Sequence, residues 1–256
     1  RSPAVLSSLI EADLRRNSAS AATQKLIAEL QRLDPSNGLA DCYAVALYFG
    51  MGDTEGALEA LAEAGRKSRL VDHSIDLVLT RKIFLLNEGC TDAVALGLSA
   101  FTVPLPHLAL LRQAAGKALA QSQEMASDGN MHGALAVAED VVRIARNLST
   151  AGRSLVHDLV GIRIQTDALE QLKQLQENHG NSIGAERTGA GLEATEKRAR
   201  EISIMTAAVP KALHCMTEAD LAAYLDDLIV NGEFSALRRL PAVAEALDNS
   251  LDHTKP

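Results

Sequence analysis

GLADCYAVALYFGMGDTEGALEALAEA, residues 38–64, contains two helical segments separated by a Gly-Asp pair. Small residues recur where the two segments would cross, at Ala44 before the pair and at Ala57 and Ala64 after it. Small side chains let two antiparallel helices approach closely, while a Gly-Asp pair provides a tight turn and an N-cap. The stretch therefore predicts a helical hairpin.

The composition extends this prediction to the whole chain. Of its 256 residues 47% are hydrophobic, and among these are 42 Ala and 38 Leu but only 25 Val and Ile. Ala and Leu are strong helix formers, whereas Val and Ile favour strands. We expect an all-α protein of about ten to twelve helices, arranged as stacked antiparallel hairpins.

The charge balance bears on the class of partner. The chain has 25 Lys and Arg against 33 Asp and Glu, and aromatic residues make up only 3%. Nucleic-acid binding needs a positive field and aromatic stacking faces, so it is disfavoured.

No run of about 18 apolar residues is present, so membrane insertion is not expected. The chain begins with Arg1, as expected after removal of a signal peptide or anchor, or for a domain of a longer protein; localisation and oligomeric state stay open.

Two segments indicate breaks in the helical pattern. Residues 101–106 contain two prolines, and residues 179–191 contain four glycines. We therefore expect N-terminal hairpins over 1–100, a central hairpin and a long helix over 101–178, a glycine-rich linker or helix break over 179–191, and a C-terminal helical segment over 192–256. One continuous array is the alternative. Pro241 is expected to interrupt the last helix.

The hairpin at 38–64 resembles a tetratricopeptide repeat, a helical hairpin of about 34 residues. Pro35 falls where the preceding repeat of that family would carry its terminal proline. Aligning the turn glycine Gly52 with Gly129 and Gly232 gives two weaker matches, and the three glycines are 77 and 103 residues apart. The resemblance implies a right-handed superhelix of stacked hairpins.

In that family the inner helix of each hairpin lines a concave groove that receives a peptide or helix of a partner protein. The resemblance places seven residues in the groove: Leu39, Cys42, Ala46, Phe49, Leu119, Gln123 and Asp226. The alternative is that these mostly apolar residues pack against neighbouring helices. The Lys/Asn clamp that binds acidic C-terminal peptides in chaperone-binding members has no counterpart here.

The sequence contains no recognisable catalytic constellation. Its seven histidines include no pair at the i,i+3 or i,i+4 spacing of helical metal sites, and no nucleophile elbow is present. His157 and Asp158 are predicted at the surface, and the three cysteines are predicted to be buried free thiols. We expect no cofactor and no metal. The sequence favours a non-enzymatic scaffold that binds a protein or peptide; the alternative is a sensor or regulatory domain that binds a small molecule.

Overall fold

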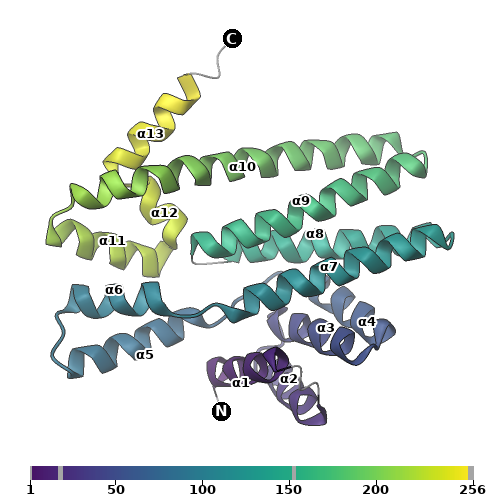
Figure 1. Cartoon of the computed structure of the whole chain (residues 1–256), viewed down its shortest axis with the longest axis horizontal. Helices are drawn as coiled ribbons and strands as arrows, with labels where there is room; N and C mark the ends of the chain where they lie inside the picture. Colours follow the sequence, from purple (N-terminus) through teal and green to yellow (C-terminus); the bar gives the residue numbers. More distant parts are fainter. Residues whose placement is uncertain (1, 17–19, 152–153, 253–256) are drawn as a thin grey trace. The chain divides into compact units, whose positions relative to one another are not determined.

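A computed structural model describes residues 2–16, 20–151 and 154–252. These residues form thirteen helices, and the one β-type feature among them is an isolated bridge between Asn37 and Arg69 (Figure 1). The predicted all-α class is confirmed. The structure has one helix more than the expected range because Pro241 begins a separate last helix, where its missing N–H costs no hydrogen bond.

The chain divides into two compact units, and each is described by itself. Unit 1 comprises the described residues of Arg1–His73, Leu105–Gly152 and Val160–Glu196; unit 2 comprises those of Ser74–Pro104, Arg153–Leu159 and Lys197–Pro256. One division thus falls between Pro104 and Leu105, inside the segment with two prolines. Residues 74–100, grouped with the N-terminal hairpins in the sequence prediction, belong to unit 2.

Unit 1 is built from short and long hairpins. It contains α1 (Pro3–Arg15), α2 (Ala21–Leu33), α3 (Leu39–Met51), α4 (Thr54–Arg66), α7 (Pro106–Ser127), α8 (Met131–Ala151), most of α9 (Leu155–Asn178) and the first half of α10 (Ser182–His214). Helix α3 packs against α1, α2, α4 and α7, and α4 packs against α8. The core is made largely of Leu and Ala, including Leu6, Leu30, Ala118 and Leu148. Ala57 and Ala64 are buried in the α3–α4 hairpin, as its spacing predicts.

Three of the described hairpins close with the same turn chemistry. Gly52, Gly129 and Gly180 have φ of 77°, 84° and 75°, in the left-handed region that favours glycine. Each is followed by Asp or Asn, whose backbone N–H bonds the carbonyl five residues back and whose side chain accepts the N–H three residues on. These side-chain oxygens cap the backbone N–H groups of Gly56, Gly133 and Gly184. The pattern is Gly-Asx-x-x-Gly, and two of its turns are the sequence-aligned glycines Gly52 and Gly129.

Unit 2 contains a smaller set of helices. They are α5 (Ser74–Asn87), α6 (Asp92–Thr102), α11 (Glu218–Asn231), α12 (Glu233–Arg238) and α13 (Pro241–Asp252), with the first residues of α9 and the second half of α10. Helix α6 packs against α5 and α11, and α12 packs against α11 and α13. Thr217 and Asp220 form a capping box at the start of α11.

The glycine-rich segment is mostly helical. Only residues 179–181 lie between α9 and α10, and residues 182–191 form the first turns of α10. Thr188 donates a buried hydrogen bond to Gln176 of α9 at 2.8 Å, and a Cβ at Gly191 would lie 3.7 Å from Leu169. Close packing of α10 on α9 outweighs the low helix propensity of glycine.

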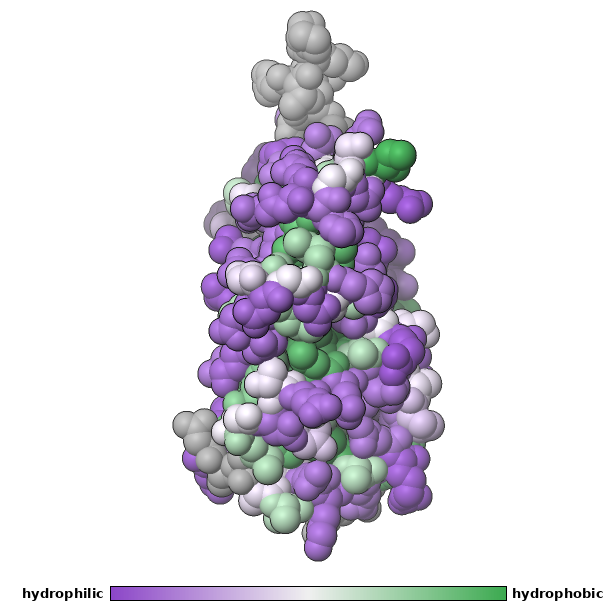
Figure 2. Space-filling view, turned by 90° about the vertical axis from the view of Figure 1, so that its right-hand side faces the viewer, coloured by the Kyte–Doolittle hydropathy of each residue, from purple (hydrophilic) through white to green (hydrophobic). Residues whose placement is uncertain are grey.

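Most of the charged residues are on the outer faces of the helices, although several large apolar side chains are exposed as well. The face drawn in Figure 2 is predominantly hydrophilic, with hydrophobic side chains visible between the polar ones and at one edge. Among the helices that the structure describes, none has both the length and the apolar character that a membrane span requires.

Candidate functional site: a polar groove over helix α3

The seven residues predicted to line a groove do not gather on one surface. Leu39, Cys42 and Leu119 are buried in the core of unit 1. Ala46 and Phe49 are half-buried and line a cavity of about 100 Å³ with residues of α1 and α7. Gln123 is exposed on α7 and Asp226 is exposed on α11 of unit 2. The apolar face of α3 is thus used for packing, the alternative that the sequence left open.

The opposite face of α3 forms the floor of an open groove in unit 1. The groove has a volume of about 870 Å³, with α2 and α4 as its walls. Its floor includes Asp41, Ala44, Leu47 and Tyr48. The α3 face is therefore polar at one end, where Asp41 interrupts an otherwise apolar helix.

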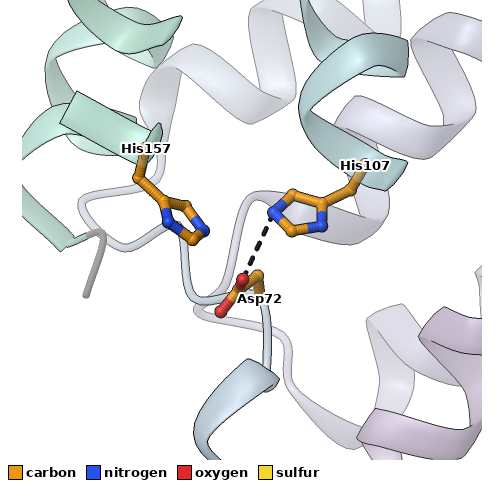
Figure 3. A group of neighbouring side chains, drawn as sticks. All are labelled: Asp72, His107 and His157. Atoms are coloured by element: carbon orange, nitrogen blue, oxygen red, sulfur yellow. Dashed lines mark ion pairs between the residues drawn. The ribbon is translucent and has the colours of Figure 1, made fainter. Parts of the chain in front are cut away.

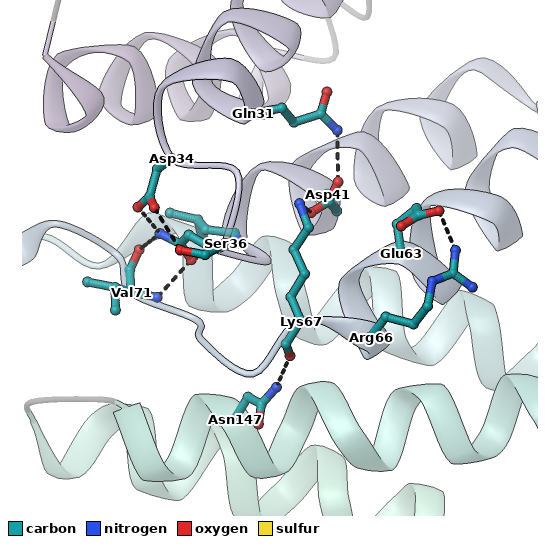
Figure 4. Close-up of polar contacts among 11 residues, drawn as sticks. Gln31, Asp34, Ser36, Asp41, Glu63, Arg66, Lys67, Val71 and Asn147 are labelled. Atoms are coloured by element: carbon teal, nitrogen blue, oxygen red, sulfur yellow. Dashed lines mark hydrogen bonds and ion pairs between the residues drawn. The ribbon is translucent and has the colours of Figure 1, made fainter.

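Asp41 is held at the groove floor by two neighbours (Figure 4). Its side chain accepts a hydrogen bond from Gln31 Nε2 at 2.8 Å and forms an ion pair with Lys67 Nζ at 2.6 Å, although Asp41 is only 3% exposed. A buried carboxylate is tolerated only when it is paired in this way. The Lys67 carbonyl accepts a hydrogen bond from Asn147 Nδ2 at 2.7 Å, which fastens the end of α4 to α8.

The walls of the groove carry further charges and hydrogen-bonding groups. Glu59 and Glu63 are exposed on α4, and Glu63 pairs with Arg66. Asp53 lies at the start of α4 and accepts the Gly56 N–H at 2.9 Å. On the α2 side, Gln24 Nε2 donates to the Tyr48 hydroxyl at 3.2 Å.

A second polar cluster of unit 1 is buried rather than open. Glu11 Oε1 accepts a hydrogen bond from the Tyr43 hydroxyl at 2.5 Å and lies 3.6 Å from His107 Nδ1. The other ring nitrogen, Nε2, lies 3.2 Å from Asp72 Oδ2 (Figure 3). Burial raises the pKa of the Glu11 carboxyl, while the Tyr43 hydrogen bond and His107 act in the opposite direction. Because its two nitrogens contact different carboxylates, His107 ties α1 to the segment before α5.

Unit 2 has its own buried polar cluster, and it corrects a sequence prediction. His157 and Asp158 are 2% and 3% exposed, so their predicted surface position is wrong. Asp158 accepts a hydrogen bond from Arg198 of α10 at 2.8 Å, and Arg198 lies over the ring of Phe234 at 4.5 Å. Burial raises the pKa of Asp158 against the lowering effect of Arg198. A partner 40 residues away in the chain satisfies this carboxylate, so local spacing gave no sign of its burial.

The cysteines are free, as predicted, but differ in exposure. Cys42 is buried, Cys90 is half-buried and Cys215 is exposed. Burial raises the pKa of the Cys42 thiol well above its usual range, which makes it unreactive. The prediction of burial is therefore confirmed for Cys42 and wrong for Cys215.

In comparisons with known proteins, no family model, no curated protein and no solved structure matches this chain. Function is therefore inferred from the surfaces of the two units.

Proposed function

We propose that this chain is a non-enzymatic scaffold of tetratricopeptide-like helical hairpins, and that the groove over α3 binds an extended, positively charged segment of a partner protein. The observation that carries the proposal is the groove itself. Among the described residues that line it are the carboxylates of Asp41, Asp53, Glu59 and Glu63 but only one cation, Arg66.

The charges of the groove favour a basic partner. Of the four carboxylates, Asp41 is paired with Lys67 and Glu63 is paired with Arg66, which leaves a formal charge of two negatives (four minus two). Opposite charges across an interface steer the approach of a partner and disfavour partners of the wrong sign. A segment with Lys or Arg side chains meets this requirement.

The hydrogen-bonding groups favour an extended segment. A peptide in an extended conformation has no internal partners for its backbone N–H and C=O groups, so its binding site must supply them. Gln24, Gln31 and Tyr48 lie along the groove and provide amide and hydroxyl groups. The small side chains of Ala28 and Ala60 on the two walls leave room for a peptide backbone.

The hairpin geometry supports the tetratricopeptide-like assignment. Helices α3 and α4 are 13 residues each, pack against one another, and are joined by the Gly52-Asp53 turn. The helix preceding them, α2, packs against α3 and provides the second wall of the groove. A groove lined by successive hairpin helices is how arrays of this type bind their partners.

The α5–α6 hairpin of unit 2 offers a second surface suited to protein binding. Ile83 and Phe84 are 61% and 60% exposed, and further large apolar side chains on the same hairpin are exposed as well: Leu77, Leu79, Leu86, Val94 and Leu98. Leu77 and Phe84, seven residues apart, share one face of α5, and exposed apolar side chains that include an aromatic residue are typical of protein–protein interfaces.

A peptide-display experiment tests the groove proposal. A random nonapeptide library is selected on the full chain, and binding of the selected peptides is measured by fluorescence anisotropy. We expect enrichment of Lys and Arg, and loss of binding in the double variant Glu59→Lys/Glu63→Lys. The matched control, Glu124→Lys/Glu170→Lys, makes the same charge change at exposed positions of α7 and α9 outside the groove and should retain binding.

Two results would refute the proposal: selected peptides without basic residues, or equal weakening by the groove variant and its control. Raising the salt concentration should also weaken binding, because exposed charges are screened.

A further inference from the structure

Unit 2 contains an open cleft that the proposed function does not use. It has a volume of about 830 Å³ and is bounded by the end of α10 and by α11, α12 and α13, the green and yellow helices near the C-terminus in Figure 1. Pockets of about 300–1,000 Å³ are the usual size for small-molecule sites. The cleft is therefore large enough for a small organic molecule.

The walls of the cleft are mostly apolar. They include Met216, Tyr224, Val230, Leu240 and Pro241. The Tyr224 side chain is largely buried in the wall, whereas Val230 is exposed in the cleft. Such walls stabilise a ligand with an apolar body, because binding removes apolar surface of both ligand and protein from water.

Four carboxylates lie among these apolar residues: Asp220, Asp226, Asp227 and Glu245. Arg239 is the one cation among the described lining residues, and it is paired with Asp227. Glu245 pairs with Lys211 at 3.3 Å. Four carboxylates against two cations leave two negative charges, so the cleft disfavours an anionic ligand and attracts a cation.

Asp227 adds an unused acceptor. Its Oδ1 accepts hydrogen bonds from Asn231 and Arg239, whereas its Oδ2 is buried without a hydrogen-bond partner in the described part of the chain. Because this oxygen is closed to water, a ligand N–H would reach it only after the Asp227 side chain turns toward the cleft, and the new hydrogen bond would offset the cost of the missing donor.

The spacing of the carboxylates distinguishes an organic cation from a metal ion. Calcium and magnesium need several oxygen ligands around one point. Among the described residues, no three carboxylates of the cleft bring ligand oxygens within 4.8 Å of one another. The charge is distributed around apolar walls, which suits a cation that also has apolar surface.

We infer that this cleft binds a small organic cation with an apolar body, such as an aryl-alkyl ammonium. This ligand class goes beyond the proposed peptide scaffold, and it gives chemical content to the small-molecule alternative that the sequence left open.

Titrations of the full chain with three probes of one shape test the inference. The probes are 2-phenylethylammonium, the neutral 2-phenylethanol and the anionic 3-phenylpropanoate, and binding is followed by chemical-shift changes. We expect saturable binding of the ammonium, roughly fivefold or more tighter than the alcohol, and no binding of the carboxylate. Equal affinity for the ammonium and the alcohol would overturn the inference, as would the absence of saturable ammonium binding, whether or not basic peptides bind the groove over α3.

Variants locate the site. Asp226→Asn should weaken ammonium binding about threefold, whereas Asp248→Asn removes the same charge from α13 outside the cleft and should leave binding unchanged. Ala223→Trp places a large side chain in the cleft and should abolish binding. Persistence of binding in a folded Ala223→Trp variant, or equal effects of the two Asp→Asn changes, would contradict the inference.

The exposed thiol of Cys215 gives a readout that requires no cleft-filling variant. Cys215 lines the cleft, and its reaction with a cationic and an anionic methanethiosulfonate can be compared in a Cys90→Ser background. In each reaction the thiolate forms a disulfide and methanesulfinate leaves. We expect the ratio of cationic to anionic rates to exceed that of N-acetylcysteine amide and to fall with Asp226→Asn. A ratio equal to that of the free thiol would overturn the inference.

Discussion

Two glycines inside helices of unit 1 should respond in opposite directions to the same substitution. Gly116 lies in α7, and a Cβ built there meets no heavy atom within 4 Å. Gly161 lies in α9, and a Cβ built there would lie 2.9 Å from Ser149 Cβ and 3.0 Å from the Ala145 carbonyl oxygen of α8. The backbone nitrogen of Ser149 is also 3.0 Å from this Cβ. Backbone atoms such as this nitrogen and the Ala145 oxygen cannot rotate away from the new methyl group.

The magnitudes follow from two opposing effects. Replacing a mid-helix Gly by Ala gains about 1 kcal/mol of helix propensity. Overpacking a close helix crossing costs about 1–3 kcal/mol, and the upper part of that range applies where backbone atoms must move. We therefore expect Gly116→Ala to raise the free energy of unfolding by about 0.5–1 kcal/mol. Gly161→Ala should lower it by about 1–2 kcal/mol, the overpacking cost less the propensity gain.

Urea unfolding followed by circular dichroism at 222 nm measures both changes. The slopes of the two variants should match that of the parent chain, so that the midpoints report stability. A Gly161→Ala variant as stable as the parent chain, or more stable, would refute the assignment of a tight α8–α9 crossing at Ser149. A destabilised Gly116→Ala variant would show that the surroundings of that residue are not open.

Three further predictions concern the buried cluster and the exposed hairpin. Tyr43→Phe should lower the free energy of unfolding by about 1–3 kcal/mol, because it removes the hydrogen bond to a buried carboxyl group; urea unfolding at neutral pH measures this, and an unchanged midpoint would contradict it. Since burial raises the pKa of Glu11, the folded state keeps the Glu11 proton at pH values where the unfolded state has lost it, so stability should fall as pH rises from the ordinary glutamate pKa through the raised one. Glu11→Gln should flatten this fall in unfolding curves collected across that pH range. An unaltered pH profile in the variant would refute the prediction. Phe84→Glu should reduce the fluorescence of a bound hydrophobic dye and change the free energy of unfolding by less than about 0.5 kcal/mol. The control Thr80→Glu, at an exposed position of the same helix, should leave the dye signal unchanged. Equal dye signals for the two variants would argue against an apolar surface at Phe84.

Local signals predicted the fold class and the hairpin turns. The Gly52-Asp53 pair predicted a turn and a cap, and both are present, because a left-handed glycine and an N-cap are determined by residues close in sequence. A third copy of the pattern, at Gly180-Asn181, is equally visible in the sequence. The glycine count of 179–191 obscured it, since the fixed spacing of Gly and Asx is more informative than composition.

The groove and the buried clusters depend on pairings that are distant in sequence. Asp41 is a polar residue in an otherwise apolar helix, and its partner Lys67 comes from the end of the next helix. Tyr43 and Glu11 are 32 residues apart, and their contact depends on how α1 packs against α3. The helical repeat limits which residues of α3 can share a face, but packing decided which face became core and which became groove.

Helix length limits how far the groove can extend. A repeat array has a continuous concave surface only when successive hairpins are nearly equal in length, so that each contributes the same rotation. Here α3 and α4 are 13 residues each, but α7 and α8 are 22 and 21, and α9 and α10 are 24 and 33. The same Gly-Asx-x-x-Gly turn therefore occurs in hairpins of unequal length. A peptide bound in the groove should contact α2, α3 and α4 alone, which limits the recognised segment to a few residues. Its charge specificity then comes mainly from Asp53 and Glu59, the two carboxylates that remain after the pairs of Asp41 and Glu63.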